Sequence, residues 1–253
     1  MAGNRDEDTA RSMAAARKGA GAALPKRFYV SAEVREFANG FAVALDGKPI
    51  RTPGRRQLIV PGRPIAEAMA AELSAQLATI DPATMPMTRL VNSAIDGVAG
   101  HEGEVAADIA KYAGSDLVCY RAEAPAGLVA LQNARWDPVL VWAETAHNWR
   151  LVHSTGVVHV AQPAKTLAGI AEAVARYDAL ALAGLHSMTT LMGSVLLALA
   201  VAERHLAADA AWMAAHVDED FQISQWGADA EAAARRAFRW RDMQAAAILV
   251  EAN

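Results

Sequence analysis

The stretch "GFAVALDGKPIRTPGRRQLIVPGRPIAEAMAAELSAQLATI", residues 40–80, contains the change of pattern that decides the fold. In its first half, short apolar runs are separated by DG, PG and PG at 46–47, 53–54 and 61–62, dipeptides that are typical of turns. Together with the aromatic and β-branched segment at 27–37, these runs predict about four short antiparallel strands.

The second half of the stretch changes to helical spacing. Ile65, Met69, Leu73 and Leu77 recur every four residues and predict one buried stripe. Later patterns predict helices at 87–98, 103–113 and 125–148, a hairpin at 150–162, and four helices from Lys165 onward. The segment 115–122 fits either a strand or an extended connector.

The last predicted helix has a clear beginning. Asp229 is a good N-cap, because its side-chain oxygen can accept a hydrogen bond from the first free N–H groups. Ala234, Phe238, Ala245 and Leu249 then form the predicted buried stripe.

These patterns predict an α+β fold, with a small antiparallel β-rich N-terminal module followed by a larger, mostly helical C-terminal domain. The predicted boundaries give a flexible tail at 1–26, a β-rich domain at 27–62 and a helical domain at 63–253.

Composition limits the class of protein. Hydrophobic residues make up 53% of the 253 residues, which indicates a globular chain. The net charge of -4 argues against general nucleic-acid binding. Cys119 is the single cysteine, so no internal disulfide can form, and a reducing compartment such as the cytoplasm is expected. No apolar signal segment begins the sequence.

One stretch has the length of a membrane span. Residues 179–202 carry no charge. However, polar residues lie in its middle, among them His186 and Ser194, and an apolar helix is also what the centre of a helical domain requires. We expect no stable membrane insertion, and a membrane-anchored protein is kept as a third, weaker hypothesis.

Familiar catalytic motifs are absent from the sequence. It contains no glycine-rich phosphate loop, no nucleophile elbow around Ser187, and no zinc-binding pattern of cysteines and histidines. We therefore predict no cofactor and no metal.

The acidic segment "HVDEDFQISQWGAD", residues 216–229, is the first candidate site. If it is helical, Glu219, Gln222, Ile223 and Trp226 fall on one face. Either the two apolar residues belong to the core and the acids are solvated, or the face is a recognition patch in which Glu219 meets a partner's cation and Trp226 supplies apolar area.

Two further groups stand out. Lys48, Arg51, Arg55, Arg56 and Arg63 form a basic run without an intervening acid, which is either a solvated rim, a surface that steers an acidic partner, or a surface on which the two modules dock. In "MPMTRLVNSAID", residues 85–96, the arginine and the last aspartate favour a buried Arg–Asp bridge between two elements. Thr88 or a neighbour is expected to cap the helix there.

Several segments together resemble a known family. "RFY", "LDGKPIRTP", "LIVP", "MPMTRLVNSAID", "LQNARWDPVLVWA", "GSVLLALA" and "DEDFQISQWGAD" stand in this order between residue 27 and about residue 250. They are similar to the ATP synthase assembly chaperone of mitochondria and alphaproteobacteria.

The resemblance implies a function. Members of this family are not enzymes; they bind the free α subunit of the soluble catalytic head and prevent its aggregation until the β subunit replaces the chaperone. It also implies an essential acid in the 216–229 segment. Glu219 is the first candidate by position, with Asp218 and Asp220 as alternatives. We expect a monomer with Gln222 and Trp226 in the partner-binding surface. The alternative function is an enzyme with an unrecognised carboxylate site around Glu219 and His216 as a nearby base.

Overall fold

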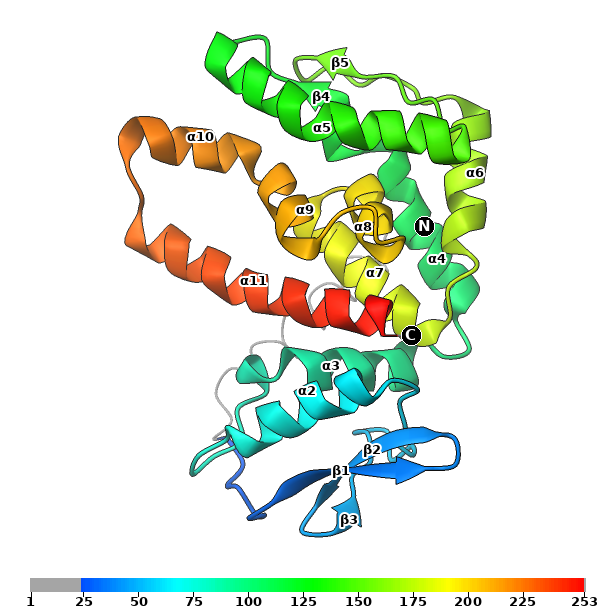
Figure 1. Cartoon of the computed structure of the whole chain (residues 1–253), viewed down its shortest axis with the longest axis vertical. Coiled ribbons are helices and arrows are strands. Elements are labelled where there is room, and N and C mark those ends of the chain that lie inside the picture. The colour runs from blue at the N-terminus through cyan, green and yellow to red at the C-terminus, as the bar shows by residue number, and fades with distance from the viewer. Residues whose placement is uncertain (1–23, 253) are drawn as a thin grey trace, which may run out of the picture.

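The structure is a computed structural model that describes residues 24–252, and it places a small sheet against a helical body (Figure 1). The antiparallel sheet has the order β1-β2-β3, with β1 at Ala32–Phe37, β2 at Gly40–Leu45 and β3 at Lys48–Pro49. This arrangement confirms the predicted α+β fold. The fourth expected strand is reduced to isolated bridges, Phe41 with Val60 and Arg51 with Gln57.

The helical part follows in chain order. Its first elements are α2 (Arg63–Ser74), η1 (Pro82–Thr84), α3 (Pro86–Ser93), the π-helix η2 (Ala94–Val98), α4 (Glu102–Lys111), η3 (Tyr112–Ser115) and η4 (Leu117–Cys119). The later ones are α5 (Ala126–His147), α6 (Ala164–Val174), α7 (Ala179–Met192), α8 (Val195–Ala202), α9 (Ala208–Ala215), α10 (Val217–Trp226) and α11 (Ala230–Glu251).

The turn between β2 and β3 forms as its sequence predicts. Asp46 and Gly47 both have positive φ, 45° and 81°, which is the backbone that a tight hairpin turn requires. The Asp46 carboxylate accepts hydrogen bonds from the N–H groups of Val30 and Ser31, at 3.0 and 2.8 Å. These bonds hold the pKa of the carboxyl below its usual range, and they tie the turn to the segment that precedes β1.

Helix α2 buries most of its predicted stripe but ends earlier than expected. Ile65, Met69 and Leu73 are buried, whereas Leu77 lies beyond the helix and is 84% exposed. The Gln76 side chain explains the early end: its Oε1 accepts from the Asp81 N–H at 2.7 Å and its amide donates to Thr84 Oγ1. The chain is thereby held in a turn after Ser74.

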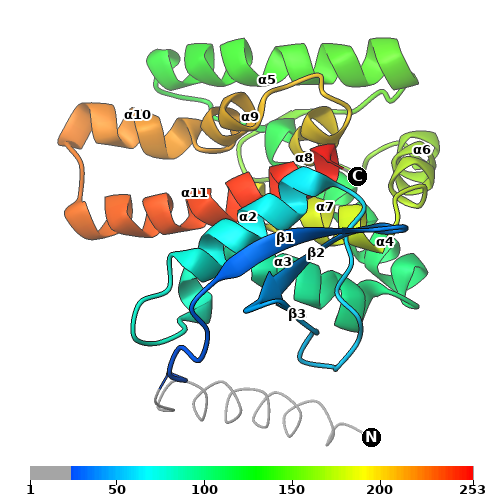
Figure 2. The ribbon, with the colours of Figure 1, turned by 60° about the horizontal axis from the view of Figure 1, so that its bottom comes forward.

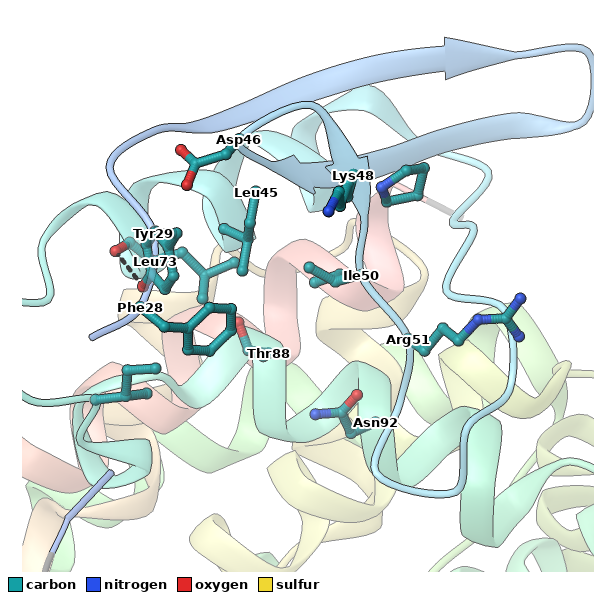
Figure 3. A pocket seen from close by; sticks show the side chains of 12 residues that line it. Phe28, Tyr29, Leu45, Asp46, Lys48, Ile50, Arg51, Leu73, Thr88 and Asn92 are labelled. Atoms are coloured by element: carbon teal, nitrogen blue, oxygen red, sulfur yellow. Dashed lines mark hydrogen bonds between the residues drawn. The ribbon is translucent and has the colours of Figure 1, made fainter. Parts of the chain in front are cut away.

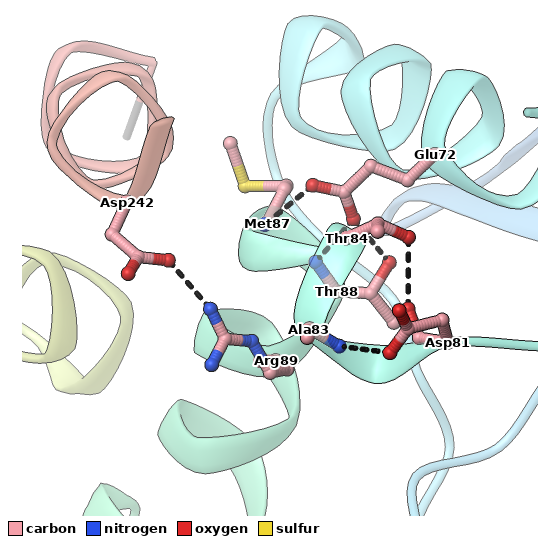
Figure 4. Close-up of polar contacts among 8 residues, drawn as sticks. All are labelled: Glu72, Asp81, Ala83, Thr84, Met87, Thr88, Arg89 and Asp242. Carbon is pink, nitrogen blue, oxygen red and sulfur yellow. Dashed lines mark hydrogen bonds and ion pairs between the residues drawn. The ribbon is translucent and has the colours of Figure 1, made fainter. Parts of the chain in front are cut away.

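The sheet lies across α2 and α3 (Figure 2). Their shared apolar core also includes residues of α7 and α11. Helix α3 is capped from outside its own segment. Glu72 of α2 accepts hydrogen bonds from the N–H groups of Met87 and Thr88 and from the Thr88 hydroxyl (Figure 4). The expected cap by a local side chain was therefore wrong.

The predicted buried Arg–Asp bridge was wrong in its partner and in its burial. Arg89 contacts Asp242 of α11 at 2.5 Å (Figure 4), and the Arg89 side chain is 43% exposed. Asp96 instead accepts hydrogen bonds from the Thr52 hydroxyl and the Gly54 N–H. The "MPMTRLVNSAID" segment thus ties α11 to α3 and the 52–54 loop to η2.

The uncharged stretch 179–202 forms two helices in the centre of the fold. Gly193, at φ 67°, ends α7, and the Ser194 hydroxyl accepts from the Leu197 N–H at 3.0 Å to begin α8. From Val195 to Val201 every residue of α8 is buried. Among residues 24–252, no helix is long and apolar enough to cross a membrane.

A buried carboxylate completes the cap of α8. Asp116 is fully buried, and its oxygens accept from the N–H groups of Leu196, at 3.1 Å, and Val118, at 3.2 Å. Burial raises the pKa of Asp116 to about 6, against a usual value of 3.8. Two side chains therefore cap the N-terminus of the central helix, Ser194 and Asp116 of the η3–η4 connection.

Helices α7 and α11 are in close contact at Gly184. A Cβ at this position would lie 2.6 Å from Val250 Cγ2 and 2.8 Å from the Ala246 carbonyl oxygen. We expect Gly184→Ala to lower the free energy of unfolding by about 1–3 kcal/mol, because the helix backbone must move. Urea unfolding would measure this change. Gly103→Ala in α4 is the control, since its Cβ would meet no atom within 4 Å. An equal effect of both substitutions would contradict the account.

Three sequence predictions in the helical part were wrong. The segment 150–162 forms no hairpin; its strand β5 (Ser154–Thr155) pairs in parallel with β4 (Tyr120–Arg121). Six helices, not four, follow Pro163, because breaks occur at 193–194 and at residue 216. Asp229 does cap α11, but Ala234 is exposed and Phe238 is half-buried, so the buried stripe begins later.

The domain boundaries remain predictions. Residues 1–23 of the predicted tail lie outside the described residues, whereas Lys26 pairs with Thr79 in a β-bridge.

Candidate functional site

The acidic segment forms α10, a short helix between α5 and α11 (Figure 1). It follows α9 after a break at His216, and Gly227, at φ 87°, starts the turn into α11. The three acids occupy the first turn of α10, where negative charge interacts favourably with the helix dipole.

Two of the three acids hold α10 in place. Asp218 accepts a hydrogen bond from the Gln132 amide of α5 at 2.7 Å. Asp220 forms an ion pair and hydrogen bond with Arg236 of α11, which raises the pKa of the arginine. The Phe221 ring also packs against Gly127 of α5. Helix α10 is therefore fixed from both sides.

Glu219 is the acid with the fewest contacts. Its nearest cationic atom is Arg236 Nη1, at 3.9 Å, a group that Asp220 already contacts more closely. The Glu219 side chain is 37% exposed. This carboxylate remains available to a partner's cation.

The predicted face is largely exposed. Gln222 and Trp226 follow Glu219 along one side of α10, and Trp226 is 80% exposed, while Ile223 is half-buried. The exposed indole shows that Trp226 is not a core residue. Exposed aromatic side chains on a fixed backbone are typical anchors of protein interfaces.

His216 does not fit the role of a catalytic base. Its ring is buried and packs on Trp212 with the centroids 3.9 Å apart, and Nδ1 lies 2.8 Å from the Trp212 carbonyl oxygen. Burial lowers the pKa of the imidazole. The side chain therefore belongs to the packing between α9 and its neighbours.

The enzyme hypothesis required a concave pocket at α10. No residue of α10 lines any of the five most prominent cavities formed by residues 24–252. The same part of the chain contains no cluster of side chains suited to a metal ion.

The basic run does not act as one unit. Arg63 pairs with Glu36, and Arg56 lies 4.0 Å from Asp96. Lys48 and Arg51 line a cavity beside the sheet. The acids of α10 contact side chains of α5 and α11 instead. The two modules are therefore not held together by ion pairs between the acidic segment and the basic run.

Solved structures with the same architecture identify the family. A candidate chaperone from Agrobacterium tumefaciens shares 45% sequence identity over 90% of this chain and 86% of its own, with a TM-score of 0.84. Atp12 from Paracoccus denitrificans shares 39% identity over 89% of this chain and 97% of its own, with a TM-score of 0.81. A sequence model described as ATP12 chaperone protein matches residues 26–144. The chain belongs to the ATP12 chaperone family.

Membership in the ATP12 family confirms the resemblance to the ATP synthase assembly chaperones. An aspartate-to-lysine mutant of the Paracoccus Atp12p matches this chain with a TM-score of 0.80, close to the 0.81 of the unmutated protein. In that relative, a charge reversal of one carboxylate is therefore compatible with the fold.

Sequence reasoning missed the two partners of the acidic segment, Gln132 and Arg236. Arg236 lies 16 residues beyond Asp220, and only the antiparallel turn at 227–229 brings them together. The one available sequence signal for this turn was a predicted helix followed by Gly227 and by the N-cap residue Asp229. Gln132 had no local signal, since it comes from a helix 86 residues away in the sequence.

Proposed function

We propose that this ATP12-family chain binds the free α subunit of ATP synthase and keeps it from aggregating until the β subunit replaces it. The observation that supports this most directly is the exposed face of α10, where Glu219, Gln222 and Trp226 present a carboxylate, an amide and an indole on a helix that α5 and α11 hold in place.

This chemistry suits a temporary partner. Subunits of a ring form obligate interfaces that typically bury more than about 2,000 Å², so a free subunit exposes a large apolar flank. A chaperone must cover part of that flank and still be displaced. A small face that combines a charge, an amide and one aromatic anchor gives the intermediate affinity that such displacement needs.

The proposed site is Glu219, with Asp218 and Asp220 as positioning residues that fix α10 on its neighbours. Trp226 and Gln222 complete the contact. In this proposal the protein acts as a monomer in the cytoplasm, and it needs neither nucleic acid nor a cofactor to hold the subunit.

Light scattering tests the proposal. Denatured α subunit is diluted into buffer with this protein, or with an equal mass of albumin as the control. We expect this protein to suppress scattering at about one copy per α subunit, and we expect added β subunit to displace it. Scattering that is unchanged at a tenfold excess of the protein would contradict the proposal.

A further inference from the structure

A second surface lies beside the sheet, away from α10 (Figures 1 and 3). A cavity of about 600 Å³ opens between the β2–β3 turn, the segment before β1, and helices α2 and α3. Its apolar wall includes Phe28, Leu45, Ile50, Leu73 and Ile80. The volume falls within the roughly 300–1,000 Å³ of typical ligand pockets.

The wall that contains Phe28 is held rigidly. The neighbouring Tyr29 is buried and its hydroxyl donates to the Leu73 carbonyl oxygen at 2.8 Å. The Arg27 guanidinium donates to the carbonyl oxygens of Tyr29 and Val30, the two residues that follow Phe28. Phe28 itself is 76% exposed, and its ring lies roughly perpendicular to that of Tyr29, with the centroids 5.3 Å apart. An exposed aromatic ring on a fixed backbone is thus available to a partner without further ordering.

The rim of the cavity is positively charged. Lys48 has no acidic partner in the described part of the chain, and within residues 24–252 the Arg51 guanidinium donates only to the Arg55 carbonyl oxygen, at 3.0 Å. Residues 47–66 include no aspartate or glutamate. The one carboxylate at the cavity, Asp46, is occupied by the N–H groups of Val30 and Ser31. The rim therefore favours an occupant with negative charge.

The floor of the cavity contains an unused acceptor. Asn92 of α3 lines the cavity, and its buried Oδ1 accepts no hydrogen bond from residues 24–252. Buried polar atoms normally have a partner, so an exception of this kind is a candidate contact for a bound molecule.

We propose that this cavity is a second docking site for the polypeptide that the chaperone holds, and that it takes a bulky apolar side chain flanked by carboxylates. The apolar wall and Phe28 receive the side chain, and Lys48 and Arg51 meet the carboxylates. The identity of the polypeptide rests on the proposed function, whereas the chemistry of the site rests on the residues that line the cavity.

A peptide probe tests the chemistry directly. The probe is a fluorescein-labelled peptide with a Leu-Phe-Leu centre and two acidic residues on each side, and its counterpart has lysines in their place. Fluorescence anisotropy should show binding of the acidic peptide and at least tenfold weaker binding of the basic one. Lys48→Glu with Arg51→Glu should weaken binding of the acidic peptide by at least tenfold. Equal affinity for both peptides, or no binding of either, would overturn the proposal.

The control for this double variant is Lys165→Glu with Arg241→Glu, which makes the same charge change at two exposed positions outside the cavity. It should bind the acidic peptide as the wild type does. An equal loss in the control would show that net charge, not this cavity, causes the effect, and would also overturn the proposal.

Retention of the tagged α subunit separates this inference from the proposed function. If the wild type retains the α subunit and the Lys48→Glu, Arg51→Glu protein retains several-fold less, both stand. If the two proteins retain it equally, the second docking site is wrong and the proposed function stands. If the wild type retains none, the proposed function is wrong, and the peptide measurement alone decides the chemistry of the cavity.

Discussion

The Glu219→Lys protein is expected to fold as the wild type does and to lose the suppression of α-subunit aggregation that we propose for this chain. Glu219 forms no hydrogen bond within residues 24–252 and lies 3.9 Å from Arg236, which keeps its closer partner Asp220. Glu219 is half-buried and this pair is longer than an ordinary ion-pair contact, so it should contribute only about 0–1 kcal/mol and the fold should tolerate the change. The partner's cation would instead meet a lysine, and like charges at an interface cost several kcal/mol.

The measurement for Glu219→Lys combines the light-scattering assay with circular dichroism. Suppression should fall at least tenfold, while the unfolding midpoint moves by only a few degrees. Glu104→Lys is the matched control, because this glutamate also lies in the first turn of a helix, α4, and has one distant cationic neighbour, His101 at 3.7 Å. Normal suppression by a folded Glu219→Lys protein would show that the site is wrongly assigned.

The Asp116→Ala protein is expected to lose about 3 kcal/mol of unfolding free energy at pH 4, because the buried N–H groups of Leu196 and Val118 lose their acceptor. Urea unfolding measures this loss. Asp178→Ala is the matched control. Asp178 caps α7 in the same manner but at an exposed position, so its replacement should cost only about 1 kcal/mol.

The loss caused by Asp116→Ala should also depend on pH. The folded-state pKa of Asp116, about 6, lies above the usual 3.8, so between these two values the folded protein binds more protons than the unfolded chain. The contribution of this carboxyl is therefore full below pH 3.8 and decreases as the pH rises through 6. The total decrease is about 3 kcal/mol. The gap between wild type and Asp116→Ala should narrow from pH 4 to pH 7, and a constant or widening gap would contradict the buried-carboxyl account.

The local parts of the fold could be predicted from the sequence. The Asp46-Gly47 turn, the buried face of α2 and the N-cap at Asp229 all depend on residues that are close together in the chain. The family resemblance also came from the sequence, because its segments are long and mixed in composition.

The sequence predictions that were wrong concern contacts between residues far apart in the chain. Helix α3 is capped by Glu72 from another helix, and β5 pairs with β4 more than 30 residues earlier in the chain, so neither contact has a local pattern. The break inside 179–202 is different. Gly193 and Ser194 are ordinary stop and start signals for helices, but the uninterrupted apolar run concealed them.

At α10 the sequence predicted which residues share one helical face, but it did not predict that the three acids have different contacts. Glu219, Gln222 and Trp226 were expected on one side because their spacing matches the helix period. Asp218 contacts α5 and Asp220 contacts α11. These contacts could not be predicted, because they depend on how three helices pack.

Co-purification tests the central claim most directly, namely that this chaperone recognises one subunit of the catalytic head before assembly. The protein is expressed together with separately tagged α and β subunits, and each tag is captured in turn. We predict that the chaperone is retained with the α subunit and is absent from the β-subunit fraction. Retention with the β subunit, or with neither, would contradict the account.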